Sequence, residues 1–243
     1  MQQEIKGYIH VHSNYSFDGK NSVKELAEFF AAKGYEFVCL TEHADDFDDF
    51  KMASLVNDCK KYSDKYITVV PGLEYRCNDL VHLLGIGVTE LCGSDDPIEV
   101  SRHIKQNGGV AIVAHPRGYE KNLTPTLINV IDGLEIWSGP KDSRFFPHWE
   151  SLLTFKNLKR IYPSLIGLGG ADLHTIEAYF PLDTIIKTNS EAFSSSGFSN
   201  GVLSIKGAYW NLLPGSISSF QRELTLKVLR IALNMAKRFM HRI

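Results

Sequence analysis

Histidines and carboxylates recur at or near the ends of short apolar segments in this 243-residue chain. His10 and His12 close the first segment, and residues i and i+2 of a β-strand point to the same face. Asp172 and His174 repeat that spacing later in the chain. Six of the nine histidines and three carboxylates fall at such positions: His10, His12, Asp18, His43, Glu74, His82, His115, Asp172 and His174.

These residue types in these places predict bound metal ions. A single histidine on a strand is usually a satisfied core or surface residue. That explanation weakens as histidines accumulate, because buried imidazoles without partners are costly in free energy. Imidazole and carboxylate ligands without cysteine suit Zn²⁺, Mn²⁺ or Fe²⁺ better than Ca²⁺ or a structural zinc. Nine ligands exceed what one ion binds, so we expect two or three divalent ions.

Short strands that alternate with helices must position these side chains. Helical spacing predicts helices at Val23–Lys33 and Phe50–Tyr62. Seven strands are predicted, at Ile5–Val11, Phe37–Leu40, Ile67–Val70, Val81–Val88, Val110–Ala114, Leu134–Trp137 and Leu165–Leu168. This alternation is typical of a parallel α/β fold, and seven strands favour a barrel over an open sheet. In such barrels the loops that follow the strands converge on one face, where the active site lies.

Six short motifs then resemble the PHP (polymerase and histidinol phosphatase) family in order and in strand position. They are His10-Val11-His12-Ser13, Ser16-Phe17-Asp18-Gly19, Thr41-Glu42-His43, Pro71-Gly72-Leu73-Glu74, Ala114-His115-Pro116 and Ala171-Asp172-Leu173-His174. The resemblance extends over residues 7–175. It implies an α/β fold, a distorted (β/α)7 TIM-like barrel, with a metal centre of two or three ions.

The same resemblance implies a division of the ligands. His10, His12, Glu74 and Asp172 would hold one ion, with Glu74 bridging to a second that His82 and His115 complete. Asp18, His43 and His174 would hold or border a third ion. Glu42 is expected to orient its neighbours without binding metal.

Phosphoester hydrolysis follows from such a centre. A hydroxide that bridges two ions is a strong nucleophile, since coordination lowers the pKa of water from 15.7 to about 7. Asp18 or His174 would act as a catalytic acid toward the leaving group. Arg117, Lys141 and Arg144 are candidate phosphate anchors, or else ordinary surface cations.

Several other features allow two interpretations each. Trp137 and Tyr119 either stack on a substrate ring or contribute to packing. The acidic run 45–49 either lines the metal site or begins the next helix, and we favour the helix. Residues 1–190 are expected to form the barrel, and residues 191–243 a loop followed by a basic amphipathic helix at Ser216–Met240. We expect that helix to pack on the same domain, although membrane or nucleic-acid binding would also suit it.

Composition excludes several classes of protein. With 26 Lys+Arg against 28 Asp+Glu, the chain lacks the positive field of a general nucleic-acid binder. No stretch approaches the roughly 18 apolar residues of a membrane span, and the start has no signal-peptide pattern. The four cysteines show no CxxC spacing, so we expect reduced thiols and a cytoplasmic protein.

The leading hypothesis is therefore a zinc- or manganese-dependent phosphatase acting on a small phosphorylated metabolite. A 3′–5′ exonuclease or another nucleic-acid phosphodiesterase is the alternative, against which the near-neutral charge counts. A non-catalytic metal-binding module is a third hypothesis. An amidohydrolase-like enzyme would share the barrel but would favour a carboxylated lysine where Glu74 stands.

Overall fold

The computed structural model describes residues 3–139, 141–142, 147–188 and 202–207. Five α-helices occur in these ranges: α1 (Val23–Ala32), α2 (Asp49–Tyr62), α3 (Pro97–Gln106), α4 (Pro125–Ile128) and α5 (Trp149–Ile161). The same ranges contain eleven strands: β1 (Gln3–Val11), β2 (Phe37–Leu40), β3 (Glu42–His43), β4 (Thr68–Val70), β5 (Gly72–Arg76), β6 (His82–Ile86), β7 (Val110–Val113), β8 (Gly133–Ser138), β9 (Ile166–Gly170), β10 (Leu182–Thr188) and β11 (Val202–Gly207).

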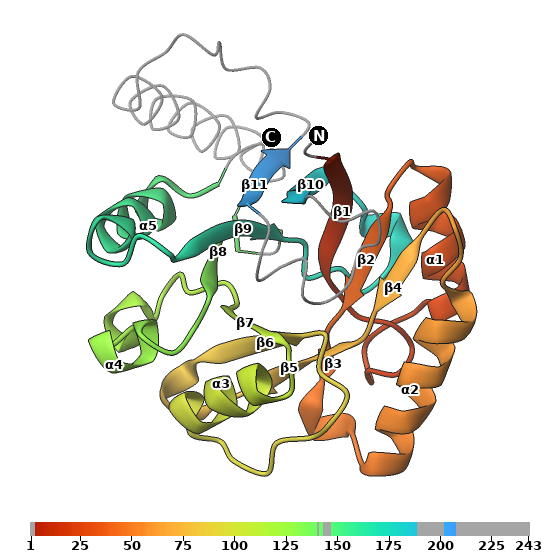
Figure 1. Ribbon diagram of the computed structural model, residues 1–243, viewed down its shortest axis with the longest axis horizontal. Coiled ribbons are helices and arrows are strands. Elements are labelled where there is room, and N and C mark those ends of the chain that lie inside the picture. The colour runs from red at the N-terminus through yellow and green to blue at the C-terminus, as the bar shows by residue number, and fades with distance from the viewer. Residues whose placement is uncertain (1–2, 140, 143–146, 189–201, 208–243) are drawn as a thin grey trace, which may run out of the picture.

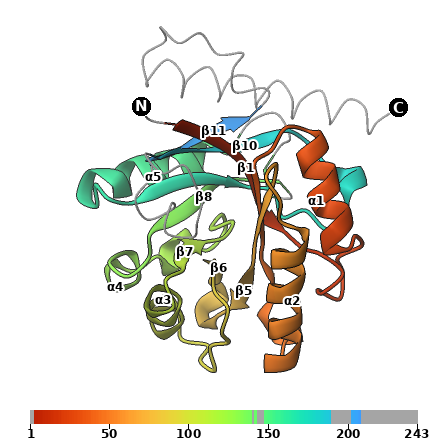
Figure 2. The same ribbon diagram turned by 45° about the vertical axis from the view of Figure 1, so that its right-hand side comes forward.

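The strands form two sheets, with the helices on the outside of them (Figures 1 and 2). One sheet has the order β11-β10-β1-β2-β4, and the other has the order β3-β5-β6-β7-β8-β9. Single residues, Thr41 and Pro71, separate β2 from β3 and β4 from β5, so the chain passes directly from one sheet into the other. The expected mixed α/β fold with parallel strand pairs is therefore present.

The distorted (β/α)7 barrel that the sequence predicted is found only in part, because the described strands form two sheets and not one closed barrel. β6 runs antiparallel to β5, with which it forms a hairpin that pairs Arg76 with His82, and it also runs antiparallel to β7. The two sheets approach each other again where Val11, at the end of β1, bridges to Leu173 beyond β9. There the His12 N–H donates to the Leu173 carbonyl at 2.8 Å, and the Leu173 N–H donates to His10. The described strands thus form two sheets that face each other across a shared interior.

Two of the predicted helices are found where helical spacing placed them. A capping box between Ser22 and Glu25 begins α1, which buries Leu26 and Phe30 against the sheet. The Asp48 side chain caps α2 by accepting from the Lys51 N–H. This capping role agrees with the helix-initiating interpretation of the acidic run.

A core of apolar side chains fills the space between the two sheets. It consists of strand residues from both sheets and a residue that follows β7, without any helix residue: Ile5, Ile9, Phe37, Cys39, Val70, Leu84, Ile86, Val110, Ile112, Ala114, Leu168 and Ile186. Strands that are buried on both faces read as continuous apolar runs, which explains why these segments were visible in the sequence. This core supports the strand ends that carry the candidate ligands.

Four strands were not predicted. β3 follows β2 after Thr41, β5 continues β4 after Pro71, and β10 and β11 pair antiparallel beside β1. The predicted helix at Ser216–Met240 lies outside the described residues. Within the described part of the chain, no helix combines the length and apolar character needed to cross a bilayer. The four cysteines are free thiols, three of them buried.

Gly72 provides a test of how closely β5 approaches its neighbour β6 and, in the other sheet, β2. A Cβ atom there would lie 2.5 Å from the Gly85 carbonyl oxygen and 2.8 Å from that of Leu40. Because both contacts are with backbone, Gly72→Ala is expected to destabilise the fold by about 1–3 kcal/mol. Thermal unfolding followed by circular dichroism should show a Tm several degrees lower. Gly93→Ala is the control, since no described atom lies within 4 Å of that position. An unchanged Tm in Gly72→Ala would contradict the close approach.

Candidate metal centre

The predicted ligands come together at one edge of the two sheets. His10 lies near the end of β1 and His12 directly follows that strand. His43 ends β3, and Glu74 lies in β5. His115, Asp172 and His174 lie in the loops that directly follow β7 and β9. His82 is the first residue of β6 and reaches the same edge because that strand runs in the opposite direction. The sequence placed it within a parallel strand, and the hairpin corrects that placement.

Glu74 lies at the centre of the cluster. Its Oε1 atom is 2.8 Å from His82 Nδ1 and 3.2 Å from His115 Nε2. Its Oε2 atom is 3.5 Å from the Nε2 atoms of both His10 and His12. The two carboxylate oxygens therefore face two different groups of histidines.

Within the described part of the chain, three groups of side chains have the spacing of a metal site. They are His10, His12, Glu74 and Asp172; Glu74, His82 and His115; and His12, His43 and His174. The first two coincide with the expected sets. In the third, His12 joins the two histidines, while Asp18 lies beside them, 3.1 Å from His174 Nε2 and 3.3 Å from His43 Nε2. All nine expected side chains thus lie in one cluster.

The separations around the Nε2 atoms of His10 and His12 suit shared cations better than hydrogen bonds. The buried Nε2 atoms of His10 and His12 have no hydrogen-bond partner among the described residues. Each of them lies 3.5 Å from Asp172 Oδ1, beyond the usual range of about 2.7–3.2 Å for such bonds. Two ligand atoms about 2.1 Å from a tetrahedral ion lie about 3.4 Å apart. The residues therefore fit divalent metal ions.

Burial and neighbouring charges act in opposite directions on the ionisable groups of the cluster. Burial lowers the pKa of His12 to about 4, which leaves its imidazole neutral and able to bind a cation at neutral pH. Burial would also lower the pKa of His10, but Glu135, Asp172 and Glu74 raise it well above the usual value. Burial would raise the pKa of Glu74, but His10, His115 and His43 hold it well below the usual value, so this carboxylate is ionised.

The backbone is unusual at three of the ligands. His10, His115 and Asp172 have φ angles of 64°, 29° and 48°, in the region that side chains other than glycine rarely adopt. At His10 the register between β1 and β2 also shifts. The rings of His10 and His12 lie 5.2 Å apart, yet a regular i, i+2 strand does not explain their placement. Such strain persists where a functional site requires a particular side-chain direction.

Glu135 in β8 is a site residue that sequence reasoning missed. Its Oε1 atom lies 2.6 Å from His10 Nδ1, and its Oε2 atom accepts the His115 N–H at 2.7 Å. Gly170 leaves room for it, because a Cβ there would lie 1.6 Å from Oε1. A carboxylate on the far nitrogen of a metal-binding histidine fixes its tautomer and ring orientation. The signal was available, since Glu135 is a lone charge within an apolar strand.

Glu42 holds the loop after β1, in keeping with the orienting role expected for it. Its carboxylate accepts hydrogen bonds from the Ser13 hydroxyl and the Ser16 hydroxyl, each at 2.6 Å. The Ser16 hydroxyl in turn accepts the His43 N–H at 3.0 Å. Glu42 belongs to none of the three ligand groups.

The candidate phosphate anchors lie in neighbouring loops. Arg117 is exposed and donates from Nη1 to the Lys141 carbonyl, which joins the loop after β7 to the loop after β8. The Lys141 side chain is exposed, and Arg144 lies outside the described residues. Trp137 and Tyr119 are buried, which agrees with packing and not with substrate stacking.

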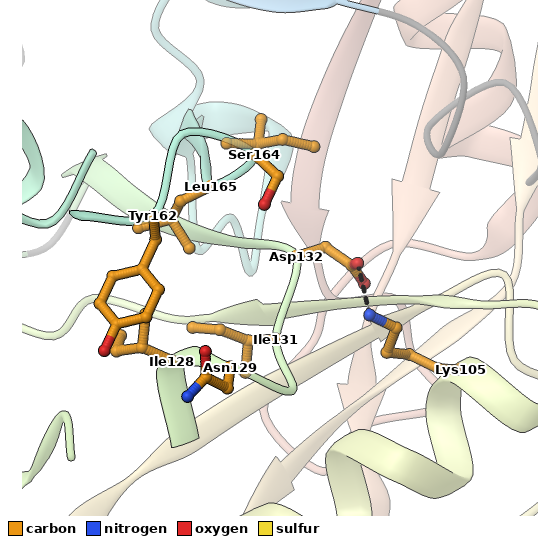
Figure 3. Close-up of a pocket in the computed structure, with 9 residues that line it drawn as sticks. Lys105, Ile128, Asn129, Ile131, Asp132, Tyr162, Ser164 and Leu165 are labelled. Carbon is orange, nitrogen blue, oxygen red and sulfur yellow. Dashed lines mark hydrogen bonds and ion pairs between the residues drawn. The ribbon is translucent and has the colours of Figure 1, made fainter. Parts of the chain in front are cut away.

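A hollow of about 310 Å³ lies at the opposite end of the strands. Its lining includes the Lys105–Asp132 ion pair, Tyr162 and Ser164, near the beginnings of β7, β8 and β9 (Figure 3). None of the nine candidate ligands lines it. The hollow is therefore separate from the candidate metal cluster.

Comparison with protein-family models tests whether the chain belongs to the family that its six motifs resemble. The PHP domain model matches residues 9–211. The chain belongs to the PHP family. This match confirms the resemblance of the six motifs. A comparison of the PHP protein with curated proteins finds no match.

Solved structures share the fold of this PHP protein. PsfC from Pseudomonas syringae has a TM-score of 0.62 at 14% identity, covering 95% of this chain and 99% of PsfC. A two-domain protein from Bacteroides vulgatus, described as containing a predicted PHP-like metal-dependent phosphoesterase, has a TM-score of 0.61 at 16% identity over 85% of this chain. The lesion-specific endonuclease PfuEndoQ from Pyrococcus furiosus has a TM-score of 0.56 at 16% identity over 84% of this chain. The PHP chain spans 65% of the Bacteroides protein and 58% of the endonuclease.

Proposed function

We propose that this PHP protein is a metal-dependent phosphatase that hydrolyses the phosphomonoester of a small metabolite. The observation that carries the proposal is the position of Glu74, whose carboxylate belongs to two groups of candidate metal ligands. A third group of histidines lies beside them. Membership of the PHP family supports hydrolysis as the reaction class. Zinc, manganese and iron are the ions that these ligand types suit.

Divalent ions bound by these residues would lower the pKa of coordinated water and neutralise charge on the phosphoryl oxygens. The residues of the chain supply the geometry. Glu74 presents one oxygen to each of two ligand groups, and Glu135 holds the His10 ring in place. Arg117 and Lys141 would bind the outer phosphate oxygens from adjacent loops.

Asp18 and His174 would supply a proton to the leaving group, and their position in the cluster supports this role. Their side chains are 35% and 29% exposed, and His174 Nε2 lies 3.1 Å from Asp18 Oδ2. This pair lies at the open edge of a cluster in which His10 and His12 are fully buried. A group that donates a proton must reach the substrate oxygen, and this exposure permits it.

Removal and restoration of metal tests the proposal. Protein treated with a chelator should lose phosphate release from p-nitrophenyl phosphate, and Mn²⁺ or Zn²⁺ should restore it. Bis-p-nitrophenyl phosphate and single-stranded DNA provide the diester comparison, since the fold shared with an endonuclease favours a nucleic-acid substrate as the second candidate. Hydrolysis of the diesters alone would replace the phosphatase by a nuclease. No turnover of any of these esters by metal-loaded protein would contradict the phosphoesterase proposal.

A further inference from the structure

Phe17 is a large apolar side chain left in solvent beside the metal cluster. It is 75% exposed, although a fully buried phenylalanine contributes about 1.5–3 kcal/mol to stability. Its ring lies 5.5 Å from the ring of His43, centroid to centroid, with 28° between the planes. This is an offset stack, and the high exposure leaves much of the Phe17 ring surface open.

The loop around Phe17 is held firmly, so the ring has a defined position. Its N–H donates to Asp46 Oδ2 at 3.1 Å. The preceding Ser16 is fixed by its hydrogen bond to Glu42, and the following Asp18 contacts His43 and His174. The ring is therefore presented at the rim of the cluster by neighbours on both sides.

We propose that Phe17 determines substrate specificity by stacking on a planar ring in the leaving group of the phosphomonoester. The inference rests on the proposed function, because the phosphate would lie at the metal ligands while the rest of the substrate extends past the rim. His43 lies against Phe17 and also belongs to the ligand group with His12 and His174. A leaving group that emerges there meets an aromatic face. Flat aromatic or heteroaromatic rings match that face better than saturated rings or chains of the same size.

Binding of phosphonates, which are not hydrolysed, tests this inference independently of turnover. Isothermal titration of Mn²⁺-loaded protein would compare benzylphosphonate with cyclohexylmethylphosphonate, which has the same carbon skeleton without a flat ring. Wild-type protein is expected to bind the benzyl compound about 5- to 10-fold more tightly, the range typical of aromatic stacking. Phe17→Ala should reduce this ratio to about one, and Phe17→Trp should preserve it. Phe50→Ala is the matched control, because Phe50 is equally exposed, at 82%, on α2.

The outcomes separate the two proposals. Equal binding of the two phosphonates by wild-type protein would overturn the role of Phe17, whether or not p-nitrophenyl phosphate is hydrolysed. If Phe17→Ala weakens both compounds equally, the ring only covers His43 and the inference is also wrong. If the benzyl preference depends on Phe17 but no phosphomonoester is hydrolysed, the stacking of Phe17 on a planar ring stands, while the phosphatase proposal and the identity of that ring as a leaving group fail.

Discussion

Glu74→Gln is expected to abolish the metal centre as a catalyst. The amide nitrogen cannot bind a cation, so one of the two ligand groups that share Glu74 loses a ligand and both lose its negative charge. We expect the bound metal to fall below one ion per chain after dialysis. Turnover of p-nitrophenyl phosphate should fall about 1000-fold or more, which corresponds to about 4 kcal/mol of lost transition-state stabilisation. Mass spectrometry of the metal content and initial rates would measure the two effects.

A matched substitution isolates the effect of position. Glu28→Gln makes the same chemical change on the exposed surface of α1, where Glu28 pairs with Lys24 at 3.7 Å. It should retain wild-type metal content and turnover, since exposed ion pairs of this kind contribute little to the stability of the fold. Circular dichroism would verify that Glu74→Gln is folded. Full metal content in a folded Glu74→Gln protein would refute the central role of this carboxylate.

Glu135→Gln is expected to weaken metal binding about 10- to 100-fold, although Glu135 belongs to none of the ligand groups. The amide keeps the shape of the side chain but removes the charge that holds the His10 imidazole at 2.6 Å. Competition with a chromogenic chelator would measure the affinity. The visible spectrum of Co²⁺-substituted protein should also change, because the orientation of His10 toward the ion changes.

This prediction distinguishes positioning of a ligand from simple support of the fold. If Glu135 only supports the strand, thermal stability without metal should fall while the Co²⁺ spectrum stays as in the wild type. Glu28→Gln again serves as the surface control. An unchanged metal affinity in Glu135→Gln would show that the hydrogen bond to His10 has no influence on the site.

Local sequence patterns were enough to predict many of the helices, the strands and the candidate ligands. Helix caps and apolar spacing depend on neighbours in the chain, so α1 and α2 were predicted to within a residue or two. Continuous apolar runs identified the strands buried on both faces. Chemical type and position at strand ends identified the nine candidate ligands, and their order identified the family.

Other features depend on which distant segments meet. The direction of β6 follows from its hairpin with β5, and antiparallel pairing leaves no mark in an apolar run. Glu135 became a site residue only because β8 places its carboxylate against His10, 125 positions away in sequence. The approach of His12 to His43 and His174 likewise required the loops after three strands to converge.

The sequence by itself determined the kind of chemistry, because ligand type, number and spacing are properties of the residues. Only the tertiary structure decided how the ligands divide into groups, which carboxylate orients them and which aromatic ring borders them. The exposure of Phe17 shows the difference, since its motif contains an apolar residue that local rules would place in a core. Its neighbours Ser16 and Asp18 are held by partners from other strand ends, and these contacts leave the ring at the rim of the metal centre.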